Sequence, residues 1–169
     1  MKKPVTSPKT VVTFSGGLDS TTLLYFLRQE GHEVLALSVD YGQRHRVELE
    51  YAARLLEPLG IQHEIADLSA IASLIGGSSQ TDDSVDVPLG HYAAENMKQT
   101  VVPNRNMIML SVAAGWAISQ KADFIAYAAH AGDHTIYPDC RSEFAEALGG
   151  VHPLEAELAL LGDRRDVVD

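Results

Sequence analysis

Cysteine is almost absent from this chain of 169 residues, in which Cys140 is the only one. A single cysteine excludes an intramolecular disulfide and any cysteine-rich zinc site within this chain. Basic residues are also few, since 13 Lys and Arg stand against 23 Asp and Glu, for a formal net charge of −10. This balance argues against general affinity for a nucleic-acid backbone but is compatible with a small basic pocket.

Long hydrophobic runs are missing too, so no segment is expected to cross a membrane. The positively charged start at Met1–Val5 is not followed by the apolar core of a signal peptide. Hydrophobic residues make up 46% of the chain, which is ordinary for a globular domain with one core. We therefore expect a cytoplasmic protein without membrane contact.

What the chain does have is an alternation of apolar runs and amphipathic segments. The predicted strands are 10–14, 32–39, 61–66 and 123–129, and the predicted helices are 19–30, 47–59, 106–120 and one from about 141. This order predicts an α/β fold with a parallel sheet and right-handed crossovers. Because the second strand is almost continuously apolar, we expect helices on both faces of the sheet, in three layers. The helix at 106–120 is apolar nearly all round, which predicts that it is buried.

The segment Ser15–Ser20 (SGGLDS) lies between the first predicted strand and the first predicted helix. Such a turn directs backbone N–H groups at one point beside a helix N-terminus, which favours bound phosphate. Gly16 and Gly17 permit a tight turn, and the serine hydroxyls and Thr21 add donors. The alternative is a tight turn with a helix cap and no ligand.

The loop has no lysine, so it is not a Walker loop, and the dinucleotide-binding pattern Gly-x-Gly-x-x-Gly is absent as well. Asp19 is unusual beside phosphate: it either caps the helix or holds a magnesium ion that bridges phosphate oxygens.

Basic side chains gather after the second predicted strand, at Arg44, His45 and Arg46. They either neutralise a phosphate or anionic substrate, or form a solvated helix start; the second alternative is disfavoured because cations oppose the dipole of a helix N-terminus. Arg105, beside Asn104, is either part of a cap with a surface charge or a contact to nucleotide phosphate.

The segment after the fourth predicted strand is the candidate for substrate recognition. Asp133 and Asp139 are able to accept hydrogen bonds from a purine-like N–H edge. His134 is suited to donating a hydrogen bond or moving a proton, and Tyr137 to stacking on a heteroaromatic ring. The alternative is a rigid turn in which Asp139 caps the following helix. We expect Cys140 to be a buried structural thiol.

The loop at 15–20 resembles the signature of the PP-loop ATP pyrophosphatases. With the segments 40–46, 102–110 and 130–141, the chain is similar to the 7-cyano-7-deazaguanine synthases of the queuosine pathway over about residues 9–148. The resemblance implies a Rossmann-like adenine-nucleotide alpha-hydrolase-type fold. It also implies an ATP-dependent carbon–nitrogen ligase that converts 7-carboxy-7-deazaguanine and ammonia into 7-cyano-7-deazaguanine, commonly as a homodimer, without binding nucleic acid directly.

The resemblance further implies roles for individual residues. Magnesium would be held by Asp19, and catalysis would involve Asp19, Asp133 and His134. Substrate would be bound by Arg44, Arg46, Asp133, Tyr137 and Asp139. ATP would be bound by Phe14, Ser15, Gly16, Gly17, Leu18, Asp19, Ser20, Thr21, Thr22, Leu23, Leu24 and Arg105.

The chain departs from the family pattern after about Leu148. The resemblance implies zinc, but the family's four-cysteine site is missing here. We expect one synthase domain at 1–148 and an atypical tail at 149–169 that forms one amphipathic helix through Leu154, Leu158 and Leu161. The segment at 72–100 is either a mobile lid or a disordered loop. Two alternatives stay open: an ATP-binding remnant without turnover, and another PP-loop amidating or thiolating enzyme.

Overall fold

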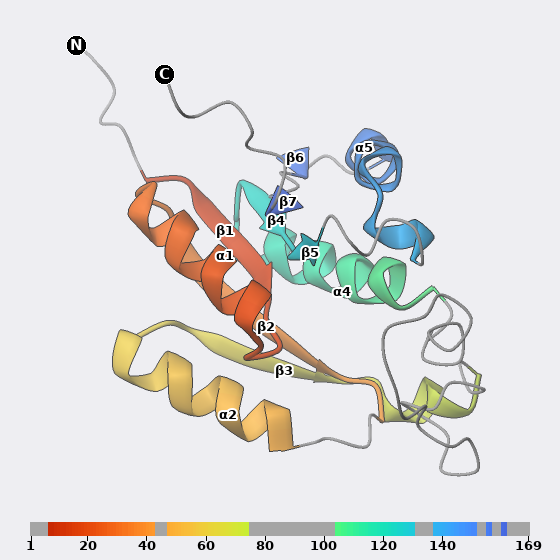
Figure 1. Ribbon diagram of the computed structural model, residues 1–169, viewed down its shortest axis with the longest axis horizontal. Helices are drawn as coiled ribbons and strands as arrows, with labels where there is room; N and C mark the ends of the chain where they lie inside the picture. The colour runs from red at the N-terminus through yellow and green to blue at the C-terminus, as the bar shows by residue number, and fades with distance from the viewer. Residues whose placement is uncertain are drawn as a thin grey trace.

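The computed structural model describes residues 7–42, 47–74, 104–130, 137–151, 155–156 and 160–161. Its main sheet has the strand order β3-β2-β1-β4-β6, and every pair in it is parallel (Figure 1). These strands are β1 (Lys9–Thr13), β2 (Glu33–Asp40), β3 (His63–Asp67), β4 (Phe124–Ala126) and β6 (Glu155–Ala156). A separate parallel pair joins β5 (Ala129–His130) to β7 (Leu160–Leu161).

Helices cover the sheet on both faces, as the sequence predicts. They are α1 (Leu18–Gln29), α2 (Val47–Leu56), α4 (Arg105–Ser119) and α5 (Ser142–Val151), with short 3-10 turns η1 (Glu57–Leu59), η2 (Ser69–Leu74) and η5 (Pro138–Cys140). Neighbouring residues of β1 face opposite cores: Val11 packs with α4 and α5, and Val12 packs with α1 and α2. The three-layer α/β prediction is confirmed.

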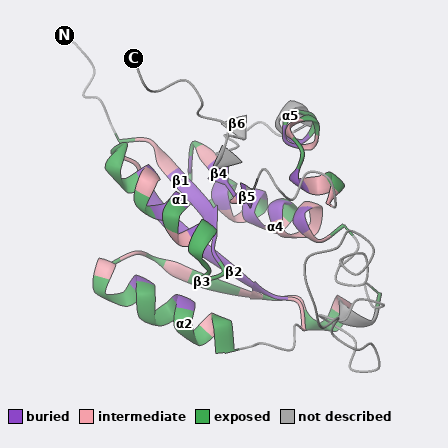
Figure 2. Ribbon diagram, viewed as in Figure 1, coloured by how far each residue is buried: buried purple, intermediate pink, exposed green. Residues whose placement is uncertain are grey.

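Burial follows the strand order. All residues of β2 except the first are buried, whereas β3, at the edge of the sheet, has only exposed and half-buried positions (Figure 2). The burial expected for the helix at 106–120 holds for one face only, because Ser111 is exposed and Ile118 is 50% exposed. Only the stripe formed by Leu110, Ala113, Ala114 and Ala117 is buried against the sheet.

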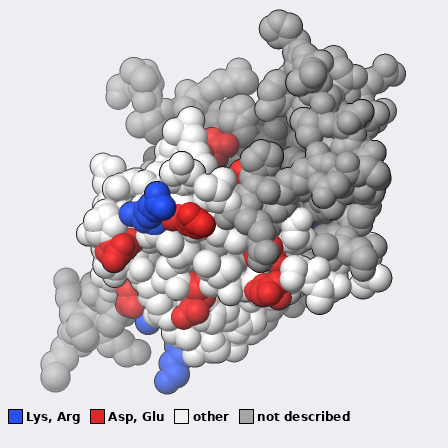
Figure 3. Space-filling view, turned by 90° about the horizontal axis from the view of Figure 1, so that it is seen from below, with Lys and Arg blue, Asp and Glu red and all other residues white. Residues whose placement is uncertain are grey.

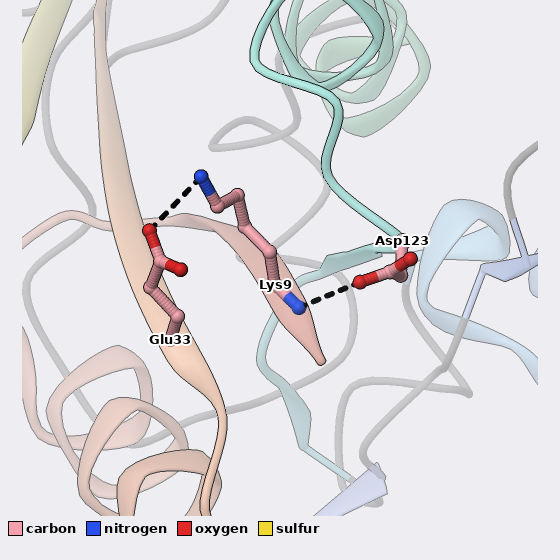
Figure 4. A network of polar contacts seen from close by, with 3 residues as sticks. All are labelled: Lys9, Glu33 and Asp123. Atoms are coloured by element: carbon pink, nitrogen blue, oxygen red, sulfur yellow. Dashed lines mark hydrogen bonds and ion pairs between the residues drawn. The ribbon is translucent and has the colours of Figure 1, made fainter. Parts of the chain in front are cut away.

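Polar contacts join the amino ends of the strands (Figure 4). The backbone N–H of Lys9 donates to Asp123 Oδ2 at 2.8 Å, and the N–H of Asp123 donates to the Lys9 carbonyl at 2.8 Å. The ammonium group of Lys9 forms an ion pair with Glu33 Oε1 at 2.9 Å. These contacts hold β1 between the start of β2 and the residue before β4.

The expected helix through Leu154, Leu158 and Leu161 is wrong, because Glu155–Ala156 and Leu160–Leu161 are short strands, and the helix that reaches into the tail is the end of α5, at Val151. β6 pairs with Phe124 and Ile125 of β4, and β7 pairs with β5, so each new strand bonds to the backbone of a strand that precedes it in the sequence. The strand predicted at 123–129 is likewise divided into β4 and β5. Among the described residues, no helix combines the length and apolar character needed to span a bilayer.

Candidate functional site

A cavity of about 380 Å³ opens at the carboxyl ends of β1, β2 and β4. Its walls come from the loop after β1, the end of β2, the start of α2, the first turn of α4 and the residues after β4. Ligands of open parallel sheets bind at this edge, where neighbouring strands diverge. Segments far apart in the sequence therefore meet at one site.

The loop between β1 and α1 is held by its own serine hydroxyls. Ser20 Oγ donates to the Gly17 carbonyl at 3.2 Å, so its single proton is used there. Ser15 Oγ, 3.2 Å from Ser20 Oγ, is then the donor between the two hydroxyls. Ser15 Oγ also accepts the N–H of Gly17 at 3.3 Å. The serines fix the shape of the loop from within.

Gly16 is the position where the loop needs glycine. Its φ of +78° lies in the left-handed region, and an added Cβ would lie 3.2 Å from the backbone nitrogen of Ala52 in α2. The φ of Gly17 is −73°, which any residue adopts. Gly16 therefore permits both the turn and the close approach of α2.

The N-terminus of α1 faces the cavity without a side-chain cap. The first helical bond runs from the N–H of Thr21 to the Gly17 carbonyl, so the N–H groups of residues 18–20 have no carbonyl acceptor within the helix. The alternative in which Asp19 caps the helix is not what the structure shows: the carboxylate makes no cap hydrogen bond, is exposed, and lines the cavity. This arrangement suits an anion accompanied by a cation.

Three predicted ATP-binding residues of α1 are used for packing or within the helix. Leu23 and Leu24 are 0% and 1% exposed and belong to the core between α1 and the sheet. Thr22 Oγ1 donates to the Leu18 carbonyl at 2.8 Å. Their side chains support the helix rather than line the cavity.

The opposite wall is built around Asp139. Its Oδ2 accepts the backbone N–H of Asn106 at 3.1 Å, so the carboxylate caps α4. The expectation that Asp139 caps the following helix is therefore corrected: it caps a helix that lies before it in the sequence. The side chain of Asn106 donates back to the Asp139 carbonyl at 3.3 Å and to Cys140 Sγ at 3.5 Å. Cys140 is buried and free of disulfides, as expected.

Tyr127, after β4, completes this wall. Its phenol donates to the Asp139 carbonyl at 3.3 Å, and its ring meets Phe144 edge-on, with centroids 6.5 Å apart. Burial, followed by the neighbouring Cys140 and Asp139, raises the pKa of the Tyr127 phenol. The phenol therefore stays protonated near neutral pH and remains a donor.

The structure brings many of the predicted site residues together. The cavity lining includes Phe14, Ser15, Gly17, Leu18, Asp19, Ser20 and Arg105. Tyr137 is half-buried and packs against the α4 side of the core, outside that lining. Arg44, His45, Arg46, Asp133, His134 and most of the segment at 72–100 lie outside the described residues.

Sequence reasoning missed Asn106 and Tyr127, which line the cavity. Asn106 follows Arg105 at the start of a helix, and a buried amide at that position was a usable signal. Tyr127 was hidden inside a strand predicted to run to 129.

Charge at the cavity is mixed. Asp19 and Glu48 line it together with Arg105, and on the face of the molecule drawn in Figure 3 acidic side chains are spread widely, with basic ones at a few places. Among the residues that the structure describes, no group of three or more His, Cys, Asp or Glu side chains is placed to hold a metal ion. A bound polyanion would thus need a cation brought with it.

The sheet, the strand order and the loop define a Rossmann-like α/β protein with an anion-binding turn after β1. A solved structure titled as a predicted subunit of tRNA methyltransferase from Methanocaldococcus jannaschii shares this fold, with a TM-score of 0.59 and 14% identity over 92% of this chain and 69% of its own. An NH3-dependent NAD synthetase from Campylobacter jejuni aligns with a TM-score of 0.51 and 17% identity over 78% of this chain and 51% of its own.

Sequence comparison identifies the family within this fold. Residues 9–159 match the model described as "Queuosine biosynthesis protein QueC", and the chain belongs to that family. A 7-cyano-7-deazaguanine synthase from Pseudoalteromonas atlantica is 60% identical over 85% of this chain and 65% of its own length. One from Hahella chejuensis is 60% identical over 83% of this chain and 60% of its own length. The chain thus spans less than two thirds of these relatives.

Proposed function

We propose that this protein is an ATP-dependent carbon–nitrogen ligase that converts 7-carboxy-7-deazaguanine and ammonia into 7-cyano-7-deazaguanine. The observation that carries the proposal is the glycine loop at the mouth of the cavity, in a chain 60% identical to relatives named for this synthase. The net charge of −10 favours a free base over tRNA as the substrate. It therefore weighs against a tRNA-thiolating enzyme with the same loop.

The chemistry requires a better leaving group than carboxylate oxygen. Attack of the substrate carboxylate on the α-phosphorus of ATP releases pyrophosphate and leaves an acyl adenylate. Ammonia then attacks the acyl carbon, AMP leaves, and an amide remains. A second activation of the amide oxygen by ATP allows its loss, which gives the nitrile. The protein has to align ATP with the acid and offset the phosphate charge.

The described residues fit the ATP part of this scheme. The unbonded N–H groups at the start of α1 point to phosphate binding, and Arg105 supplies positive charge from the opposite wall. Asp19 is an exposed carboxylate that lines the same cavity, and one carboxylate with phosphate oxygens and waters is a common set of Mg²⁺ ligands. Magnesium would offset phosphate charge in the transition state.

Zinc does not fit the residues described, because they hold no cluster able to bind it, and we assign it no step. Substrate contacts by Arg44, Arg46, Asp133, Tyr137 and Asp139, and proton transfer by His134, are part of the proposal. So is a boundary near residue 148 between the synthase domain and the tail.

The first experiment measures binding and turnover separately. ATP with Mg²⁺ is expected to raise the melting temperature, because a ligand of the folded state stabilises it. Incubation with ATP, ammonium and 7-carboxy-7-deazaguanine should give the nitrile by mass spectrometry. ATP binding without product would support the alternative of an inactive remnant, and no thermal shift at millimolar ATP would overturn the phosphate site.

Asp19→Ala tests the magnesium role. We expect turnover to be abolished and the ATP-induced thermal shift to become independent of Mg²⁺. The matched control is Glu30→Gln, which removes one exposed carboxylate just past the other end of α1, outside the cavity. A nearly normal rate in Asp19→Ala would leave Asp19 without a role in the reaction.

A further inference from the structure

Ser38 is a polar residue in the middle of a buried strand, with an exposed fraction of 1%. Its hydroxyl donates to the backbone carbonyl of Phe14 at 2.6 Å and lies 2.8 Å from Nε2 of His63. The three groups come from β2, β3 and the residue that directly follows β1. They form a continuous polar connection from the edge of the sheet to the start of the loop at Ser15.

The proton count gives each group a defined role. A carbonyl oxygen only accepts, so the single proton of the Ser38 hydroxyl is used on Phe14. The contact between Ser38 and His63 then requires that Nε2 carries a proton and donates it. Burial lowers the pKa of the His63 ring, an effect that the neighbouring Glu64 opposes. A neutral imidazole protonated on Nε2 meets both requirements.

Phe14 is the point where this connection meets the site. Its N–H donates to the Leu37 carbonyl at 2.8 Å, and its carbonyl accepts from Ser38, so both of its backbone polar groups are bonded to β2. The next two residues are Ser15, which orders the loop, and Gly16, which lies against the backbone of α2. A shift of the Phe14 carbonyl would displace the N–H groups that face the cavity.

We propose that His63 is a positioning residue for the ATP loop, acting through Ser38 on the carbonyl of Phe14. The link between His63 and ATP binding rests on the proposed function, whereas the effect of His63 on the loop conformation does not. His63 lies on the edge strand outside the cavity lining, so it acts on the orientation of the loop and not on the ligand.

Substitution of His63 by asparagine or by glutamine tests which of the two ring nitrogens is needed. Glutamine carries its NH₂ group near the place of Nε2, whereas asparagine carries it near the place of Nδ1. We expect His63→Asn to raise the KM for ATP several-fold with little change in kcat, and His63→Gln to stay near wild type. The KM for 7-carboxy-7-deazaguanine should change in neither variant. A purely structural role would lower stability in both without this split.

Amide hydrogen exchange of the unligated chain provides a readout that does not depend on activity. His63→Asn should accelerate exchange at Ser15–Gly17, and His63→Gln should not. Ser38→Ala should match His63→Asn, and the double variant should add little to either, because one connection is broken only once. Equal behaviour of the asparagine and glutamine variants in both readouts would overturn the positioning role alone. A wild-type chain that binds no ATP would overturn the proposed function, while the exchange result would still decide the effect on the loop.

Discussion

The amino ends and the carboxyl ends of the parallel strands lie on opposite sides of the main sheet, called here the amino edge and the carboxyl edge. The two differ in how their polar groups are used. At the amino edge, Lys9, Glu33 and Asp123 use their polar groups on one another (Figure 4). At the carboxyl edge, the serines of the loop bond within the loop, and Asp139 bonds to the backbone of α4. The backbone N–H groups at the start of α1 are left facing the cavity. The comparison shows how one sheet obtains stability from one edge and binding capacity from the other.

Left-handed backbone occurs at both edges, but Gly16 combines it with a close contact to α2, whereas Gly31 and Gly60, at the amino edge, have open space around an added Cβ. Gly16 and Asn104, just before the two helices that flank the cavity, have φ values of +78° and +55°, and Lys121, just before β4, has a φ of +54°. Left-handed backbone is unfavourable for side chains other than glycine and, to a lesser degree, asparagine. Left-handed backbone alone therefore does not separate the two edges, and the close contact between Gly16 and α2 is what should make a substitution at Gly16 so damaging.

Gly16→Ala should have the largest effect of all. The new Cβ would meet the Ala52 backbone at 3.2 Å in a left-handed conformation, and neither the backbone of α2 nor that of the loop can yield freely. We expect loss of the ATP-induced thermal shift and destabilisation of about 2–3 kcal/mol, measured by urea unfolding.

Two other glycines are controls for Gly16. Gly60 has a φ of +63° with nothing within 4 Å of an added Cβ, so Gly60→Ala carries the strain without the clash. Gly115→Ala, in α4, introduces neither backbone strain nor a clash, so it should leave stability unchanged or raise it slightly. If Gly60→Ala also removed ATP binding, general destabilisation would account for the effect.

Asp139→Ala should have the next largest effect. It removes the acceptor for the Asn106 N–H and a negative charge at the start of α4, which together should cost about 1–2 kcal/mol of unfolding free energy. Asp139→Asn keeps an acceptor oxygen and should recover part of the loss. An unchanged stability in Asp139→Ala would mean that the cap contributes nothing and that the carboxyl edge is held by other contacts.

The effect of Gly16→Ala arises from a local turn, and that of Asp139→Ala arises from a long-range contact. This difference explains which features the sequence could predict. The loop at Ser15–Ser20 is local, so its position, its need for glycine and its place at a helix start all follow from neighbouring residues. The partnership of Asp139 with Asn106 joins residues 33 positions apart. Local rules assigned Asp139 to the nearest helix, and only the tertiary packing of η5 on α4 shows which helix it caps.

The same distinction holds for the elements. Strands with continuous apolar sequence were predicted well, because burial on both faces leaves a clear pattern in β1 and β2. The tail was predicted wrongly, since a leucine spacing near that of a helix does not reveal that β6 and β7 find partners in β4 and β5. Pairing between distant strands leaves little trace in a short segment.

A smaller effect on the free energy of unfolding is expected when the pH is lowered, because the His63 ring then gains a proton. Its folded pKa is lowered from 6.5 by burial, so the unfolded chain binds a proton more readily. The stability that the neutral ring provides is therefore complete above pH 6.5 and declines as the pH falls toward the folded pKa. Unfolding free energies at pH 7.5 and 5.5 should fall more in the wild type than in His63→Gln. Equal slopes in the two proteins would show that His63 is not the group responsible.

Glu33→Gln should have the smallest effect, because it changes the amino edge and leaves the carboxyl edge untouched. Its ion pair with Lys9 is partly exposed, at 28% and 59% for the two side chains, and such pairs contribute about 0–1 kcal/mol. We expect a melting temperature within a few degrees of wild type, a smaller difference still at high salt, and an unchanged KM for ATP. A raised KM would show that the two edges are coupled through β1 and β2. In that case the division between a stabilising edge and a binding edge would fail, because the contacts around Lys9 would then help to set the position of Phe14 at the other end of the same strands.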